Sequence, residues 1–401
     1  MSENEQGIFL LKGSIQRYNW GGYDFIPRLL SIPNEAAQPC AEYWLGAHAN
    51  SPAMVINGEK AIPLNTFIES NKKLLGSYVA DRFHQLPFLL KVLDVRQMLS
   101  IQVHPSKEAA KKAFEEENKK GISRTAPHRN YKDDNHKPEL MVALSDFWLL
   151  HGFKPAEALH EALSATPELS FLTQHFEGDY GRVYHFVMTL PQAKADQLLA
   201  PLAKRVLPLY EKGQLEKHQP DFWAARAIKT FCNNHYDRGL FSIYLFNLLH
   251  LKKGEGIYQP AGMPHAYLEG QNVEIMANSD NVLRAGLTDK HIDVNELLKH
   301  VQFSPTIPHV LHASDTEICF YPAPAAEFQL YQYQLHRGAV QELKMDSAEI
   351  WLLLNGEIML NGQRLARGQS AFIPAGTLVN LTTDSDAAVV FRAGTPVPKN
   401  E

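Results

Sequence analysis

Cysteine is scarce in this chain of 401 residues: it has only Cys40, Cys232 and Cys319, which lie far apart and form no CxxC pair. Such scattered thiols indicate neither a disulfide framework nor a thiolate metal site. No apolar run approaches the roughly 20 residues that a membrane-spanning helix needs. The beginning, MSENEQGIFLL, lacks the basic region and the long apolar core of a secretory signal. We therefore expect a soluble protein of a reducing compartment, most simply the cytoplasm.

An excess of one charge is also lacking. The chain carries 39 Lys and Arg against 44 Asp and Glu, a formal net charge of −5, with the two signs interspersed. This balance argues against a nucleic-acid or membrane surface, and we expect a monomer with neither as partner. With 45% hydrophobic residues, the chain is long enough for two or three domains with ample cores.

The first 150 residues favour strands and loops, because short apolar runs alternate there with Gly, Pro and Asn. The clearest predicted strands are PFLLKVLDV (87–95) and LSIQVH (99–104), and we expect short helices over LNTFIESNKKLL (64–75) and SKEAAKKAFEEENKK (106–120). In the second of these helices Lys and Glu recur at i,i+4 spacing, which is typical of a solvated helix face.

From about residue 155 to residue 234 the pattern becomes helical. The segments AEALHEAL, PQAKADQLLAPLAKRVLPLYEK and DFWAARAIKTFCNN carry a period near 3.6 and little strand punctuation. We interpret them as an all-helical insertion in a β framework, with strands resuming in LFSIYLFNLLHL (240–251).

An internal similarity indicates the β architecture. LKKGEGIYQPAGMPHAY (251–267) aligns without gaps on LARGQSAFIPAGTLVNL (365–381), and both resemble a hairpin rim followed by a strand. The repeat predicts a mainly β fold with double cupin or jelly-roll barrels. We expect four segments: a first catalytic part (1–154), the helical insertion (155–234), a second catalytic part (235–310) and a C-terminal module (311–401). His265 of the first copy is Val379 in the second, so the C-terminal module should be structural and without metal.

Strand alternation selects a candidate metal site. In LSIQVHP, Ile101 and Val103 point one way and Gln102 and His104 the other. Both polar side chains could therefore hold one metal, although the solvent-facing side of an edge strand explains the same pattern. The polar loop YKDDNHKPEL ends at Pro138, which sets an extended backbone and brings Glu139 to the mouth of the next strand.

A complete ligand set follows when His265, which comes after Pro264 and a glycine turn, is added. Two imidazoles (His104, His265), one carboxylate (Glu139) and one amide (Gln102) suit a zinc ion, although glutamine is an unusual zinc ligand. With one anionic ligand the metal keeps a positive charge and remains a Lewis acid. The chain has 18 histidines, and spacing alone does not single out these two.

Basic residues form a second set. Lys91 interrupts the apolar run FLLKVL, where an unpaired ammonium would be costly, so we predict that it points into a polar cavity; a lysine at a sheet edge is the alternative. Others adjoin the predicted ligands: Lys107, Lys137, Arg284 and Lys290. Cations around a metal suit an anionic, phosphorylated substrate, whereas surface scatter is the alternative. Arg284 follows Val282 and Leu283, so we expect it at a strand or a strand end.

Several of these segments resemble one family. IQVHPSK, NYKDDNHKPEL, PHAYLEG and VEIMANSDNVLRAGLTDKHID are similar to the signature segments of the type I mannose-6-phosphate isomerases. AEYWLGAHANSP and LPFLLKVLD resemble two further blocks, and the similarity extends in family order from about residue 17 to residue 295. The resemblance implies a zinc-dependent enzyme that interconverts mannose 6-phosphate and fructose 6-phosphate. It also implies the four zinc ligands above and an active-site role for Arg284.

Aldose–ketose isomerisation requires ring opening and a proton transfer between C2 and C1 through an enediol-like intermediate. The candidate proton carriers are Glu274, Lys137 and His136, while Asp280 could orient the substrate or assist ring opening. For substrate and phosphate binding we expect Lys290, Lys91, Lys107 and Tyr267. Asp133 and Asn135 should shape the loop through bonds to neighbouring backbone.

Two alternatives belong to other classes. A cupin with two histidines and a carboxylate could be a non-haem Fe(II) oxygenase, which oxygen consumption would reveal. A non-catalytic regulator would bind the hexose phosphate without converting it. The extra Gln102 ligand and the cationic pocket argue against the oxygenase, and nothing in the chain suggests an effector domain for the regulator.

Overall fold

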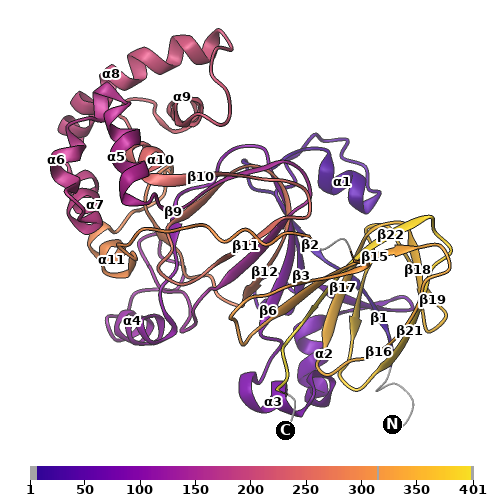
Figure 1. Ribbon diagram of the computed structural model, residues 1–401. Helices are drawn as coiled ribbons and strands as arrows, with labels where there is room; N and C mark the ends of the chain where they lie inside the picture. The colour runs from indigo at the N-terminus through magenta and orange to yellow at the C-terminus, as the bar shows by residue number, and fades with distance from the viewer. Residues whose placement is uncertain (1–6, 314–315, 399–401) are drawn as a thin grey trace.

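A computed structural model describes residues 7–313 and 316–398, and its named strands form three antiparallel sheets (Figure 1). The largest sheet carries the predicted ligands. Its main path is β10 (Phe246–Leu251), β9 (Phe147–Phe153), β12 (His265–Ala277), β6 (Phe88–Val95), β3 (Glu42–Gly46) and β2 (Ser14–Gln16). Four short strands attach to it: β7 (Gln102–Val103), β8 (Glu139–Ala143), β11 (Gly256–Gln259) and β13 (Leu283–Arg284).

The second sheet combines the two ends of the chain. Its order is β14 (Ile318–Tyr321), β15 (Gln329–His336), β22 (Ala387–Gly394), β17 (Glu349–Asn355), β20 (Ser370–Ile373), β1 (Phe9–Lys12), β4 (Met54–Asn57) and β5 (Lys60–Pro63). Phe9 of β1 pairs with Phe372 of β20, so N-terminal strands complete a sheet of C-terminal strands. The third sheet contains β16 (Val340–Lys344), β21 (Leu378–Thr382), β18 (Glu357–Leu360) and β19 (Gln363–Ala366). The predicted segment boundaries and the double cupin architecture stay predictions.

The helices gather mainly in one stretch of the chain. Between residues 156 and 245 the regular elements are α5 (Ala156–Ser164), η2 (Pro167–Leu169), α6 (Leu172–Phe176), α7 (Tyr180–Thr189), α8 (Gln192–Glu211), α9 (Pro220–Phe231) and α10 (Gly239–Leu245). Figure 1 shows them beyond β9 and β10, on the opposite side of the molecule from the C-terminal strands. The remaining helices are α1 (Phe25–Leu30), α2 (Leu64–Ser70), η1 (Lys72–Leu75), α3 (Ser77–Phe83), α4 (Lys107–Lys119) and α11 (Val294–His300). Among the residues described, none of the helices is both long and apolar enough to cross a membrane.

Most of the predicted elements are confirmed in place, with shorter bounds. β6 covers 88–95, and α4 begins after Ser106, whose hydroxyl accepts a hydrogen bond from the Ala109 N–H at 3.3 Å. The predicted helix over 64–75 is interrupted at Asn71, where α2 gives way to a 3₁₀ turn. The predicted strand over 99–104 retains only Gln102 and Val103 as strand residues.

The predicted strand over 240–251 is wrong in its first half. Gly239–Leu245 is helix α10, and only Phe246–Leu251 is a strand. Every residue of α10 is buried. A short helix buried on all sides has no polar face, so its apolar run reads like that of a buried strand.

Strand alternation gives the largest sheet two different faces. On β6, Leu90 and Val92 join the apolar cluster that also contains Ile350 and Leu352 of β17, so this face packs against the second sheet. Lys91 is buried on the opposite face. The polar site therefore lies on the face turned away from the sheet–sheet core.

The internal repeat is confirmed as two strand–turn–strand units. β11 leads through a turn to β12, and β20 leads through a turn to β21. Gly262 and Gly376 occupy equivalent turn positions with φ of 81° and 80°, a left-handed conformation that favours glycine. At the position equivalent to His265, Val379 is fully buried in an apolar cluster with Trp351, Ile358 and Leu381.

Val379→Asp should lower the free energy of unfolding by about 4 kcal/mol, because it buries an unpaired carboxylate in an apolar cluster. Leu378→Asp is the matched control. The Leu378 side chain, next to Val379 in β21, is 49% exposed, so this position should tolerate the charge. Chemical denaturation of both variants measures the effect. Equal stability of the two variants would contradict the burial of Val379.

Candidate metal centre and the cavity beside it

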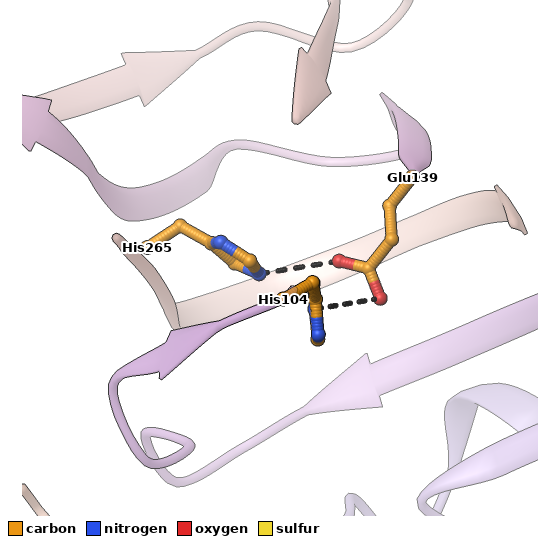
Figure 2. Close-up of side chains that lie close together, drawn as sticks. All are labelled: His104, Glu139 and His265. Carbon is orange, nitrogen blue, oxygen red and sulfur yellow. Dashed lines mark ion pairs between the residues drawn. The ribbon is translucent and has the colours of Figure 1, made fainter. Parts of the chain in front are cut away.

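Three predicted ligands meet at one buried point. Ligand atoms of His104, Glu139 and His265 all lie within 4.8 Å of one another, and the three residues are at most 3% exposed. His104 Nε2 lies 3.5 Å from Glu139 Oε1, and His265 Nε2 lies 3.2 Å from Glu139 Oε2 (Figure 2). Each imidazole thus lies next to a different oxygen of the Glu139 carboxylate.

Backbone carbonyls orient both imidazoles. His104 Nδ1 lies 2.8 Å from the Asn281 carbonyl oxygen, and His265 Nδ1 lies 2.9 Å from that of Met263. A carbonyl only accepts, so each Nδ1–H donates to its carbonyl and each Nε2 faces Glu139. Carbonyl partners of this kind orient histidine ligands in metal sites.

The pKa values of His104 and Glu139 favour the protonation states in which these groups can bind a cation. Burial lowers the pKa of His104 to about 4, so its imidazole is neutral at pH 7. Burial acts to raise the pKa of Glu139, but the Lys137 ammonium holds it well below its usual range. His104 Nε2 has no hydrogen-bond partner among the residues described. Two imidazole nitrogens and one carboxylate match the donors that zinc takes in proteins.

Gln102 lies beside this group. It pairs in register with His265 of β12 and with Arg284 of β13, and its side chain lines the same cavity as Glu139 and His265. The structure therefore brings Gln102, Glu139 and His265 to one cavity, and His104 is buried beside it, 3.5 Å from Glu139 Oε1. A metal contact by the Gln102 amide stays a prediction.

A chain of buried charges continues from the ligands. Lys137 Nζ lies 2.9 Å from Glu139 Oε1. Lys91 Nζ lies 3.1 Å from Glu274 Oε1 and 3.5 Å from Glu42 Oε2, so its predicted exit from the apolar core into a polar cavity is confirmed. Both carboxylates already neutralise this ammonium, and a phosphate contact by Lys91 stays a prediction.

Tyr267 extends the same network. Its hydroxyl donates to Glu274 Oε2 at 2.8 Å and accepts from Gln259 Nε2 at 3.1 Å. Burial, and then the neighbouring Glu274, hold the pKa of Tyr267 well above its usual value, so the phenol keeps its proton. Burial also raises the pKa of Glu274, against the effect of Lys91.

The other predicted residues lie around this centre. Arg284 is on β13, as a strand position predicted. Burial, and then the charge of the Arg284 guanidinium, lower the pKa of Lys290. Asp280 Oδ1 lies 3.3 Å from His48 Nε2.

The loop before β8 is held by its own polar side chains. Asp133 Oδ1 accepts from the Asn135 N–H at 3.0 Å and from the Ser279 hydroxyl at 2.8 Å, which confirms a loop-shaping role for Asp133. Asn135 Nδ2 donates to the Asn278 carbonyl at 2.9 Å. His136 and Lys107 both contact Glu327, at 2.8 and 3.8 Å.

Sequence reasoning missed Glu42, His48, Gln259 and Glu327. Glu42 and His48 belong to the segment AEYWLGAHANSP, where a carboxylate in a buried strand was an available signal. No sequence pattern marked Gln259 or Glu327, because their roles depend on partners that lie elsewhere in the chain.

Comparison with known proteins points to one family. A family model for the type I phosphomannose isomerase catalytic domain matches residues 8–156. The mannose-6-phosphate isomerase of Salmonella typhimurium is 40% identical over 386 residues, covering 91% of this chain and 94% of the relative. The human enzyme of that name is 32% identical over 429 residues, covering 96% and 98%.

Solved structures agree over nearly the whole chain. A zinc-bound mannose 6-phosphate isomerase has a TM-score of 0.86 and 33% identity, covering 97% of this chain and 100% of its own. The Salmonella typhimurium enzyme bound to its substrate, abbreviated f6p, and to zinc gives the same four values.

His265→Ala should lose most of its bound metal, because it removes one of three clustered donors. His151→Ala is the matched control: His151 is 3% exposed and lies opposite His265 in the β9–β12 register, but it is outside the ligand group. Elemental analysis after dialysis should give about one metal per chain for the control and for the unmodified protein. Full metal content in His265→Ala would remove this residue from the ligand set.

Proposed function

This chain belongs to the type I phosphomannose isomerase family and is therefore an isomerase, and we propose that it interconverts D-mannose 6-phosphate and D-fructose 6-phosphate with one zinc ion per chain. The observation that supports the proposal is the buried pair of imidazoles aimed at the two oxygens of Glu139. Membership of this family also favours an isomerase over the oxygenase and over the non-catalytic regulator.

The metal would be held by His104, Glu139, His265 and Gln102. When bound there, zinc supplies Lewis-acid polarisation of a sugar oxygen. Lys137, 2.9 Å from Glu139 Oε1, balances the carboxylate charge and lines the cavity in which the sugar would react.

Two cavity-lining groups suit the proton transfer between C2 and C1. Lys137 and Glu274 both lie in the cavity, whereas His136 and Asp280 do not line it. We favour Glu274, because burial raises the pKa of its carboxyl toward the range in which a base both takes and returns a proton. Lys91 and Tyr267 hold its two oxygens and so fix the direction from which it can act.

Ring opening is a separate proton movement, from the O1 hydroxyl to the ring oxygen. We assign it to His136 and Asp280, which are both partly exposed. Each has a polar partner, Glu327 and His48 respectively, that restricts its orientation. Titratable groups in such positions can exchange protons with water between turnovers.

The remaining cations are assigned by how far along the chain they lie from the paired strands β7 and β13. Arg284 pairs directly with Gln102, so we assign it to the charge that develops on O1 or O2. Lys290, six residues on, we assign to the phosphate, with Lys107 as a second contact. We also propose a cytoplasmic monomer; the net charge of −5 supports the absence of nucleic-acid and membrane partners.

A coupled assay on mannose 6-phosphate tests the function directly. The purified protein should form fructose 6-phosphate, lose this activity on chelation, and regain it with one equivalent of zinc. Fructose 6-phosphate formation that persists in fully metal-free protein would contradict the zinc proposal. No conversion at any metal content would contradict the isomerase proposal.

Arg284→Ala and Lys290→Ala should differ in their kinetics. Loss of a charge-stabilising donor should lower kcat on the order of 100- to 1,000-fold with little change in KM. Loss of a phosphate anchor should act mainly through KM. Lys253→Ala, an exposed lysine in the turn before β11, controls for charge removal alone.

Steady-state kinetics with zinc content checked first separates the two roles. Near-normal kcat in Arg284→Ala would rule out its catalytic role, and an unchanged KM in Lys290→Ala would rule out the anchor.

A further inference from the structure

A hydrogen bond joins the loop between β14 and β15 to the loop that leads into Glu139 and β8. His136 Nε2 lies 2.8 Å from Glu327 Oε1, across 191 residues of sequence. Lys107, at the start of α4, lies 3.8 Å from the same oxygen. The residue after His136 is Lys137, which contacts Glu139 at 2.9 Å. A change at Glu327 would therefore act first on the His136 side chain and then, through the peptide bond to Lys137, on the contact between Lys137 and Glu139.

The backbone at Glu327 is fixed by a hydrogen bond and by the packing of its neighbour. It lies between β14 and β15, and its carbonyl oxygen accepts a hydrogen bond from the Thr395 hydroxyl at 3.1 Å. Its neighbour Phe328 is 1% exposed and packs in the core between the two large sheets. The Glu327 residue is itself 4% exposed.

The buried carboxylate does little for the fold. Its Oε2 is buried without a hydrogen-bond partner among the residues described, and its Oε1 contacts His136 and Lys107. A buried, half-satisfied carboxylate costs stability that an apolar side chain would not. Such local conflicts with stability are expected where function requires them.

The contact also determines which nitrogen of His136 carries a proton. Burial acts to raise the pKa of Glu327, but the hydrogen bond from His136 keeps it below its usual value, so the group is a carboxylate. A carboxylate only accepts, hence the Nε2–H of His136 donates to it. In the neutral imidazole, Nδ1 then keeps a free lone pair that can hold a proton.

We propose that Glu327 is a positioning residue of the active site: the loop between β14 and β15 supplies the carboxylate that orients His136 and sets its tautomer for the isomerisation. The inference rests on the proposed role of His136 in ring opening. It gives the C-terminal module, which we expected to be structural only, a part in the reaction.

Three substitutions separate positioning from stability. Glu327→Leu should be at least as stable as the unmodified protein, because it removes a half-satisfied buried charge, yet kcat should fall roughly 10- to 100-fold. Glu327→Gln, whose amide oxygen can still accept from Nε2–H, should recover most of the loss. Glu349→Leu is the matched control: Glu349 is a buried carboxylate of the same module that pairs with Arg392 at 2.9 Å, so its loss should lower stability and leave kcat unchanged.

A double-mutant cycle with His136→Ala shows whether Glu327 acts through this histidine. Each single variant should lower kcat, and Glu327→Leu should add nothing in the His136→Ala background. Full additivity, a normal kcat in Glu327→Leu, or a stability loss in Glu327→Leu that matches the fall in kcat would overturn the proposal. A normal kcat in His136→Ala would overturn the ring-opening role of His136, and this inference with it. Absence of isomerase activity in the unmodified protein is a different result, which refutes the proposed function itself.

Discussion

The burial of the Glu139 carboxylate is the constraint on which the rest of the site depends. Removing such an ion from water costs several kcal/mol, which its neighbours must offset. Lys137 lies 2.9 Å away, and the imidazoles of His104 and His265 face its two oxygens. Lys137 balances part of this charge, and a divalent cation held by His104, Glu139 and His265 would add to the balance.

Strand alternation gives this charged group its place. β6 and β12 each direct one row of side chains into the core between the two large sheets: Leu90 and Val92 from β6, Val273 and Ile275 from β12. The intervening Lys91 and Glu274 point to the other face and pair with each other at 3.1 Å. Because the apolar rows are buried in a tight core, the register of the charged rows is also fixed.

Contacts between distant segments then hold the site on several sides. The helices reach β12 through Glu269, which pairs with Lys217 and Arg226. The C-terminal strands reach the ligand loop through Glu327 and His136. N-terminal strands complete the sheet from which Glu327 extends, since β1 pairs with β20. The site is thus assembled from the whole chain, although the predicted metal ligands come from three short segments.

Local patterns in the sequence determined the strands, most helices, the two turns of the internal repeat and the predicted metal ligands, because period, proline position and glycine turns act within a few residues. Periodicity failed at α10, where burial on every side removed the polar face that identifies a helix. The partners of the buried charges were decided by tertiary structure alone. Lys91 was recognisable as an ammonium that needs a counter-charge, but Glu42 and Glu274 are brought to it only by pairing of β6 with β3 and β12. Glu327 meets His136 only because two sheets pack together, and a contact across 191 residues leaves no periodic trace in the chain.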